Sequence, residues 1–190
     1  MTDFAPVLVK DLRHGARLEL LQPQHAPAML ALIDGNRAHL REFLPFVDET
    51  RTVGDVEAFI EGSAKRFARD SSFDAGIFQD GELTGVIGLH YVNWRSRITS
   101  VGYWLGAEYQ RQGLMTRSVN AILEHAFDTL GLNRVASAAA TGNARSNAVL
   151  QRCGFQLEGL AREAEWLYDH YVDHNLYGVL ERDWRASRQE

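Results

Sequence analysis

The sequence predicts one mixed α/β domain, covering residues 1–190, in which helices lie on both faces of a mostly antiparallel, twisted sheet. Its 190 residues, 45% hydrophobic and 24% charged, suffice to bury one sizeable core. Alternating apolar segments joined by short turns predict antiparallel neighbours. A strand, a helix and a strand in succession between residues 98 and 140 require one parallel pair, because such a crossover returns in the same direction.

The first 44 residues predict a hairpin followed by two helices. Residues 7–9 and 16–21 flank a His-Gly turn and alternate as paired strands do. Residues 22–35 carry apolar side chains at helical spacing, begin near a proline and are expected to stop at their closing Asp-Gly pair. A second short helix is expected over residues 36–44, before the next proline.

A third helix and a second hairpin follow. Thr52 or Asp55 can cap a helix whose apolar residues share one face and which runs to about Asp70. Residues 73–78 and 83–91 form the plainest hairpin in the chain, because the Asp-Gly pair between them accommodates the positive φ angles of a tight turn.

The second half of the chain alternates strands and helices. Glycine is expected to end both helices, since it adopts the left-handed conformation that commonly follows a helix. The expected elements are a strand at 98–105, a helix from Gly113 to Gly131, a strand at 134–140, a helix at 143–152 closed by Gly154, and paired strands at 155–167 and 171–180.

Residues 101–117 carry the clearest functional signal, because an apolar strand there ends in a loop whose glycine opens a helix. The first N–H groups of a helix have no intrahelical acceptor, and the peptide dipoles add partial positive charge. Gly113 lets the backbone approach an anion closely, Arg111 adds charge and Thr116 adds a hydroxyl donor. The loop therefore predicts a phosphate site; an ordinary glycine turn is the alternative.

Composition narrows the function classes. A net charge of −5 argues against sequence-independent binding to nucleic acid, which needs clustered Lys and Arg. The single cysteine, Cys153, excludes an internal disulfide and is interpreted as a packing residue. The Asp169-His170 and Asp173-His174 pairs lie in a strand-like context, so no metal site is predicted. We find neither a signal peptide nor a membrane-spanning stretch and expect a cytoplasmic protein.

Four short motifs follow one another in the second half of the chain: Gln110-x-x-Gly113, Asn143-x-x-Ser146, Cys153-Gly154-Phe155 and Leu157-Glu158-Gly159. Together with the order of elements, they resemble the GNAT superfamily of acyl-CoA N-acyltransferases. The similarity extends from Leu18 to Trp184, and the closing segment, residues 173–184, resembles the RimJ/RimL branch, the N-terminal acetyltransferases of ribosomal proteins and their relatives.

The resemblance implies acetyl-CoA as co-substrate, bound beside a splayed parallel strand pair. It places the diphosphate on the backbone amides of Arg111, Gln112, Gly113, Leu114, Met115 and Thr116, and the pantetheine arm on the backbone of Tyr103, Trp104 and Leu105 and on Asn143. The family usually has Gly or Ala at the position of Met115, so this side chain must point away from the phosphates. Core packing of Tyr103 and Trp104, and helix capping by Asn143, are the plainer interpretations.

The resemblance also implies direct attack of an amine on the thioester in a ternary complex. Ser146 matches the proposed general acid that protonates the leaving thiolate, and Glu165 matches the base that takes the amine proton. A solvated serine and a solvated strand carboxylate are the alternatives. Strand alternation is expected to place Glu163 and Glu165 on one face.

The acceptor is expected to be a primary amine, first of all a protein or peptide N-terminus such as that of a ribosomal protein. Residues 22–44 and the loop before the last strand are expected to select it. The alternatives are a polyamine or antibiotic acceptor, a longer acyl donor, and a non-catalytic acyl-CoA-binding or regulatory module. The oligomeric state stays open, with a homodimer as one form.

Overall fold

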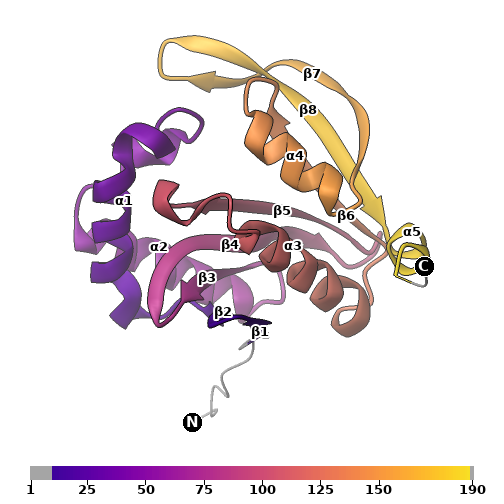
Figure 1. Ribbon diagram of the computed structural model, residues 1–190, viewed down its shortest axis with the longest axis horizontal. Coiled ribbons are helices and arrows are strands. Elements are labelled where there is room, and N and C mark those ends of the chain that lie inside the picture. The colour runs from indigo at the N-terminus through magenta and orange to yellow at the C-terminus, as the bar shows by residue number, and fades with distance from the viewer. Residues whose placement is uncertain (1–9, 189–190) are drawn as a thin grey trace.

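The computed structural model describes residues 10–188, and within them the strands form one sheet in the order β1-β2-β3-β4-β5-β6-β8-β7 (Figure 1). The strands are β1 (Lys10–Arg13), β2 (Ala16–Leu20), β3 (Phe73–Gln79), β4 (Glu82–Asn93), β5 (Ile98–Leu105), β6 (Arg134–Ala140), β7 (Gln156–Leu167) and β8 (His170–Leu180). The α-helices are α1 (Ala26–Leu40), α2 (Val53–Phe67), α3 (Leu114–Glu124), α4 (Ala144–Arg152) and α5 (Glu181–Ala186).

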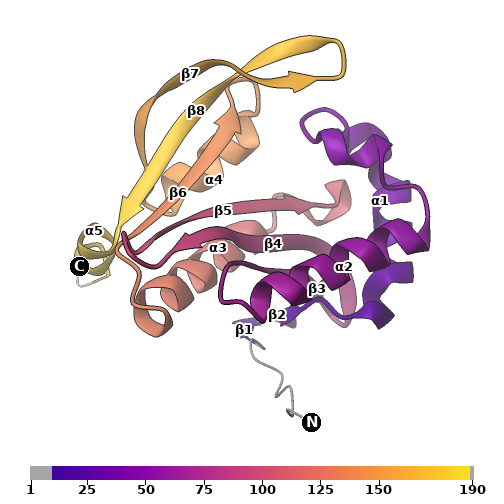
Figure 2. The ribbon, with the colours of Figure 1, turned by 180° about the vertical axis from the view of Figure 1, so that it is seen from behind.

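Two apolar layers hold the helices to opposite faces of the sheet. Helices α1 and α2 pack on one face over the first strands, whereas α3 and α4 cover the other (Figures 1 and 2). Each layer has its own buried cluster, with Ile33 and Ile60 in one and Ile122 and Leu150 in the other. The predicted fold class, with helices on both faces of a mixed sheet, is therefore confirmed.

The parallel pair lies between β5 and β6, and it is short. Ile98, Thr99 and Ser100 pair with residues 134–136, while every other neighbouring pair in the sheet is antiparallel. Past this register the ladder ends, and the Ser137 hydroxyl donates to the carbonyl of Val101 at 3.0 Å. The two strands diverge from there (Figure 1), so β5 continues with one side of its backbone free of a strand partner.

The predicted helix break at Gly35 is wrong. Helix α1 runs from Ala26 to Leu40 without interruption, so residues 22–35 and 36–44 are not two helices. Leu40 is 2% exposed and extends the buried face past the glycine. A glycine inside a helix costs only about 1 kcal/mol, less than burial of one Leu or Ile stabilises.

The turn and cap residues are mostly where the sequence predicts them. Asp80 and Gly81 have φ angles of 52° and 93°, as the β3-β4 hairpin requires. Thr52 and Asp55 cap α2 together, each side chain accepting from the other's backbone N–H. The first hairpin differs, since β1 begins at Lys10 and the predicted strand at residues 7–9 lies outside the described residues.

Helix α3 is shorter than predicted. It ends at Glu124, and a π-helical turn at His125–Thr129 completes the path to Gly131, whose φ is 64°. One extra residue per turn keeps Ala126 and Phe127 in the core, where they are 0% and 3% exposed.

A buried carboxylate ties α2 to the sheet. Asp74 on β3 is 5% exposed, accepts from Arg66 Nη2 at 3.0 Å, and has one oxygen 3.6 Å from His90 Nε2. Burial by itself raises the pKa of Asp74, but the contacts with His90, Ser63 and Arg66 outweigh it, so this pKa lies below its ordinary value.

We expect Asp74→Asn to lower the free energy of unfolding by about 1–3 kcal/mol near neutral pH. Because the folded-state pKa is depressed, the stabilisation is present above the unfolded value of about 3.9 and is lost as pH falls through the folded pKa. Urea titrations at several pH values should show a difference from wild type that shrinks in acid. A difference independent of pH would refute the assignment, and exposed Glu57→Gln on α2 should stay within about 0.5 kcal/mol.

Candidate active site

The N-terminus of α3 offers unpaired amide groups. Helix α3 begins directly after Gly113, whose backbone is left-handed with φ 71°. Arg117 N–H donates to the carbonyl of Gly113 at 3.0 Å, whereas the N–H groups of residues 111–116 have no acceptor within the described part of the chain. These donors and the helix dipole together make an anion-binding site.

The loop before α3 is held in place by side chains of its own and of α1. Gln112 Nε2 donates to the carbonyl of Glu108 at 3.1 Å, and Arg117 Nη1 donates to that of Gln112 at 3.0 Å. From α1, buried Asn36 accepts from the N–H of Ala107 at 2.8 Å. The loop is therefore shaped before any ligand arrives.

The free side of β5 supplies a second set of backbone groups. Gly106 N–H donates to the carbonyl of Thr84 on β4 at 2.9 Å. Backbone groups of alternate residues in an antiparallel strand point to opposite sides. Those of Tyr103 and Leu105 therefore face the gap that opens between β5 and β6.

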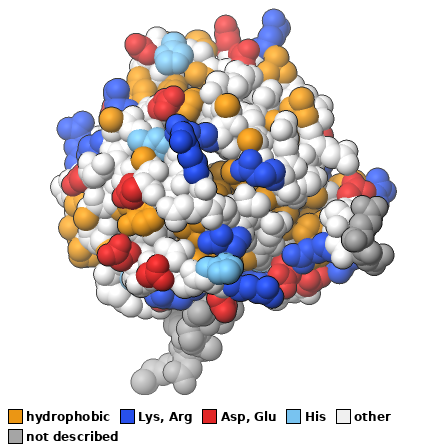
Figure 3. Space-filling model, in the orientation of Figure 1, with side chains coloured by type: hydrophobic (Ala, Val, Ile, Leu, Met, Phe, Trp, Pro, Cys, Tyr) orange, Lys and Arg blue, Asp and Glu red, His pale blue; other side chains and the backbone are white. Residues whose placement is uncertain are grey.

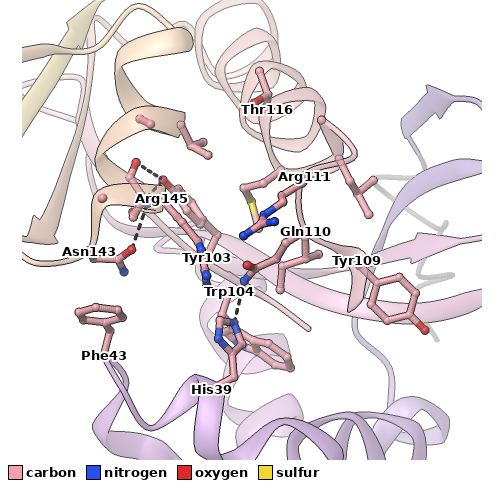
Figure 4. A pocket seen from close by; sticks show the side chains of 18 of the residues that line it. His39, Phe43, Tyr103, Trp104, Tyr109, Gln110, Arg111, Thr116, Asn143 and Arg145 are labelled. Carbon is pink, nitrogen blue, oxygen red and sulfur yellow. Dashed lines mark hydrogen bonds between the residues drawn. The ribbon is translucent and has the colours of Figure 1, made fainter. Parts of the chain in front are cut away.

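A cavity of about 630 Å³ joins the α3 amides to this gap. In Figure 4, Asn143 and Tyr103 lie on one side of it, Arg111 and Gln110 on the other, and the His39 ring meets the Gln110 amide at 2.7 Å. In Figure 3 blue Lys and Arg side chains surround a hollow with an orange interior. Of the predicted site residues, the lining includes Tyr103, Trp104, Leu105, Arg111, Gly113, Leu114, Met115, Thr116, Asn143 and Ser146.

Ser146 stands in the first turn of α4, at the cavity wall. Asn143 caps the helix, its Oδ1 accepting from the N–H of Ser146 at 3.1 Å, which confirms the capping interpretation. The Ser146 hydroxyl lies 3.1 Å from the phenol oxygen of Tyr103. Burial, the largest influence, raises the pKa of Tyr103 far above its ordinary value, so the phenol is neutral.

The two aromatic residues of β5 face opposite layers. Tyr103 packs against the cluster under α3 and α4, whereas Trp104 packs against the α1 layer, with its ring centroid 6.1 Å from that of Phe46. Both also line the cavity. Met115 is 8% exposed and sits in the core below the loop.

Glu165 lies outside the lining of this cavity. Its Oε2 is 3.3 Å from Nε2 of His174 on the neighbouring strand β8, and its side chain is one-third exposed. The regular alternation from which Glu163 and Glu165 were predicted to share one face is interrupted in the structure. A bulge between Ala161 and Glu165, with Glu163 at φ 50°, interrupts the register there and breaks the period.

A second, smaller cavity of about 420 Å³ adjoins the first. It lies between the end of α1 and the tip of the β7-β8 hairpin, and Phe43 lines both cavities. Its other walls include Glu42, Gly142, Tyr171 and Asp173.

Sequence reasoning missed several residues of the larger cavity. His39, Tyr109, Arg145 and Arg152 all line it, and none was singled out in the sequence. Arg145 is a variable position of Asn143-x-x-Ser146, and His39 falls within residues 22–44, where acceptor selection was expected. Arg145 and Arg152 are seven residues apart on α4, hence on one helix face, and this spacing could have indicated them. His39 contacts Gln110, in the loop before α3, only because α1 packs beside that loop. The sequence around His39 does not indicate this contact. Gln112, which was predicted, is not in the lining.

The residues present fit acetyl-CoA. Unpaired amides at α3 and arginines at the rim suit the phosphates, and the free backbone of β5 suits an extended arm carrying amide groups. A Cβ at Gly113 would be strained at its φ of 71°, so glycine suits the left-handed turn that opens α3.

Among residues 10–188, no group of three or more His, Cys, Asp or Glu side chains is arranged to hold a metal ion. No helix in that range is both long and apolar enough to cross a bilayer.

Comparison with known proteins agrees with the motifs. Residues 16–156 match the family model of the acetyltransferase (GNAT) domain. YdaF of Bacillus subtilis (strain 168) is 34% identical over 174 residues, 90% of this chain and 94% of YdaF. The ribosomal-protein-serine acetyltransferase of Escherichia coli (strain K12) is 29% identical over 163 residues, 86% of this chain and 91% of that protein.

A solved structure of similar fold supports the same family. RimL, a ribosomal L7/L12 α-N-protein acetyltransferase in complex with coenzyme A, superimposes with a TM-score of 0.87 at 26% identity, over 90% of this chain and 97% of RimL. The family match, the sheet with its diverging parallel pair and the open amides of α3 lead to one conclusion: this chain belongs to the GNAT family of acetyltransferases.

Proposed function

We propose that this protein transfers the acetyl group of acetyl-CoA to the α-amino group at the N-terminus of a protein, by direct attack in a ternary complex. One observation carries the proposal: the unpaired amides of Arg111 and residues 113–116, the free side of β5 and Ser146 all open onto one cavity. A diphosphate on the amides and an arm along β5 bring the thioester toward Ser146.

A group of the protein is then assigned to each step of the transfer. The amine nitrogen bonds to the thioester carbonyl carbon, and the carbon–sulfur bond breaks. A backbone N–H on the free side of β5 meets the oxyanion, and Ser146 gives its proton to the departing sulfur. The amine proton leaves through water to Glu165, which releases it to solvent. Ser146 regains a proton from solvent.

Cys153 does not serve as a nucleophile in this mechanism. It is 5% exposed, and its Sγ lies 3.7 Å from the carbonyl of Thr116. Burial raises the pKa of the Cys153 thiol to about 11, so it is protonated at neutral pH. Direct transfer needs no acyl-enzyme on this residue.

Three points support an N-terminal acceptor. The Escherichia coli relative is named for a ribosomal-protein serine, and RimL for an α-N site of L7/L12. An α-amino group, with a pKa near 8, also loses its proton more readily than a lysine side chain. The second cavity, lined by residues that follow α1 and by the first residues of β8, can receive the first residues of an extended chain end. We therefore propose a ribosomal-protein N-terminus as the first acceptor to test, with the reaction in the cytoplasm.

The deciding experiment is mass spectrometry of protein N-termini from cells with and without this protein. We expect a small set of N-termini to lose acetylation when the protein is absent. Synthetic peptides carrying those N-termini should then be acetylated in vitro, with thiol release. Acetylation of polyamines or antibiotics but of no N-terminus would instead favour a small-molecule enzyme, and coenzyme binding without any product would favour a non-catalytic module.

Glu165→Gln tests the base. Glu165→Gln should reach the wild-type rate only at higher pH, because no carboxylate at position 165 takes the proton from the amine. We expect the pH profile of kcat/KM for the peptide acceptor to move to higher pH. Glu163→Gln, an exposed carboxylate on the same strand, should leave it in place. A Glu165→Gln profile that overlays wild type would remove this residue from the mechanism.

A further inference from the structure

The contact between Ser146 and Tyr103 joins two elements that are far apart in the chain. Tyr103 lies on β5 at the diverging strand pair, whereas Ser146 lies in the first turn of α4. Their hydroxyl oxygens are 3.1 Å apart, and the phenol can also donate to the backbone carbonyl of Ser146 at 3.4 Å. The phenol has one hydrogen, and the Ser146 hydroxyl is the nearer of its two acceptors. Both residues line the large cavity.

The direction of this hydrogen bond decides what Ser146 can do. A serine hydroxyl has one hydrogen and two lone pairs. If Ser146 donates to the phenol, its hydrogen is used and cannot reach a leaving sulfur. If the phenol donates, the serine oxygen accepts, and its own hydrogen is free to point into the cavity.

The surroundings favour the phenol as donor. Burial raises the pKa of Tyr103, so its proton stays on the oxygen while Ser146 reacts. The amide cap from Asn143 holds the backbone of Ser146, which fixes where its side chain begins. A hydrogen bond from a neutral phenol also stabilises the negative charge that grows on the serine oxygen as its proton leaves.

We propose that Tyr103 is a positioning residue whose hydroxyl donates to Ser146 Oγ, directing the serine hydrogen toward the thioester sulfur. The inference rests on the proposed function of Ser146, and it adds a side-chain role for Tyr103 to the backbone role expected of β5. The phenol proton stays on Tyr103 throughout. Only the Ser146 proton moves to sulfur.

Tyr103→Phe tests this role, since it removes the hydroxyl and keeps the ring that fills the layer. We expect kcat to fall about tenfold, the effect of one hydrogen bond to a developing charge, while KM for acetyl-CoA stays within about twofold. A merely structural role would change KM or folding together with kcat.

A double-mutant cycle with Ser146→Ala tests whether the kcat loss in Tyr103→Phe depends on the Ser146 hydroxyl. Because Tyr103 acts through Ser146, Tyr103→Phe should change kcat less than about twofold in the Ser146→Ala background. Equal losses in both backgrounds would show that the phenol acts by itself and overturn the proposal, as would an unchanged or raised kcat in the single variant. If Ser146→Ala alone has no effect, the general-acid role fails first, and the two failures are distinguishable.

Tyr177→Phe is the matched control. Tyr177 is 2% exposed and donates to Asn147 Oδ1 at 2.7 Å, so the substitution removes another buried phenol oxygen that contacts α4. It does not line the cavity. We expect a lower midpoint of thermal unfolding and a kcat within about twofold of wild type. A kcat loss equal to that of Tyr103→Phe would mean that packing of α4, and not the Ser146 contact, sets the rate.

Discussion

Ser146→Ala is expected to lower kcat about 100-fold, with the dissociation constant for acetyl-CoA nearly unchanged. The variant loses the hydroxyl that faces the cavity, but the backbone N–H of Ser146 still donates to Asn143, so the helix cap remains. The coenzyme contacts proposed for residues 111–116 and for β5 do not involve this hydroxyl. Steady-state turnover with a peptide acceptor and calorimetry with coenzyme A measure the two quantities separately.

Ser118→Ala provides the comparison for that result. Ser118 is a buried serine of α3, and its hydroxyl donates only to the carbonyl of Leu114, at 3.0 Å. Because it does not line the cavity, its loss should leave kcat within about twofold of wild type. Full activity in Ser146→Ala would leave the departing thiolate to take its proton from water.

Gly113→Asp is expected to weaken coenzyme A binding most strongly, because it places a carboxylate beside the amides that bind the diphosphate. Gly113→Asn has almost the same shape, and both residues adopt left-handed backbone more readily than other side chains do. The charge alone should cost about 1.4 kcal/mol or more, so we expect Asp to bind at least tenfold more weakly than Asn. Calorimetry at low and high salt measures this difference.

The salt dependence of the Gly113 variants is informative in itself. Screening should narrow the gap between Asp and Asn as ionic strength rises, since the repulsion acts near the protein surface. Equal affinities for the two variants at low salt would mean that the diphosphate binds away from α3. That outcome would overturn the site even if both variants bind more weakly than wild type.

Turns, helix caps and helix starts could be predicted from the sequence wherever a few adjacent residues decide the conformation. The Asp80-Gly81 turn, the cap from Asn143 and the opening of α3 at Gly113 each depend on side-chain or φ preferences that act within one turn of chain. The spacing of apolar residues along the strands and helices likewise predicted the fold class. Where a distant contact competes with a local preference, prediction failed: α1 continues through Gly35 because its buried face continues to Leu40.

In the candidate site, too, the residues in local motifs were predicted and those joined by distant contacts were not. Its motifs marked the α3 amides, Asn143 and Ser146, because each stands at a helix start. The contacts of Tyr103 with Ser146, of Asn36 with Ala107, of His39 with Gln110 and of Glu165 with His174 join residues 9 to 71 positions apart, so no local pattern encodes them.

By itself, the amino-acid sequence determined the order of the strands, the single parallel crossover and the glycine that opens α3, since hydrophobic period and backbone preference are properties of short segments. Only the tertiary structure decided which side chains surround the gap between β5 and β6. That gap exists because the parallel ladder stops after Ser100, and the packing of α1, α3 and α4 around it sets which hydroxyl, ring and carboxylate come within reach of one another.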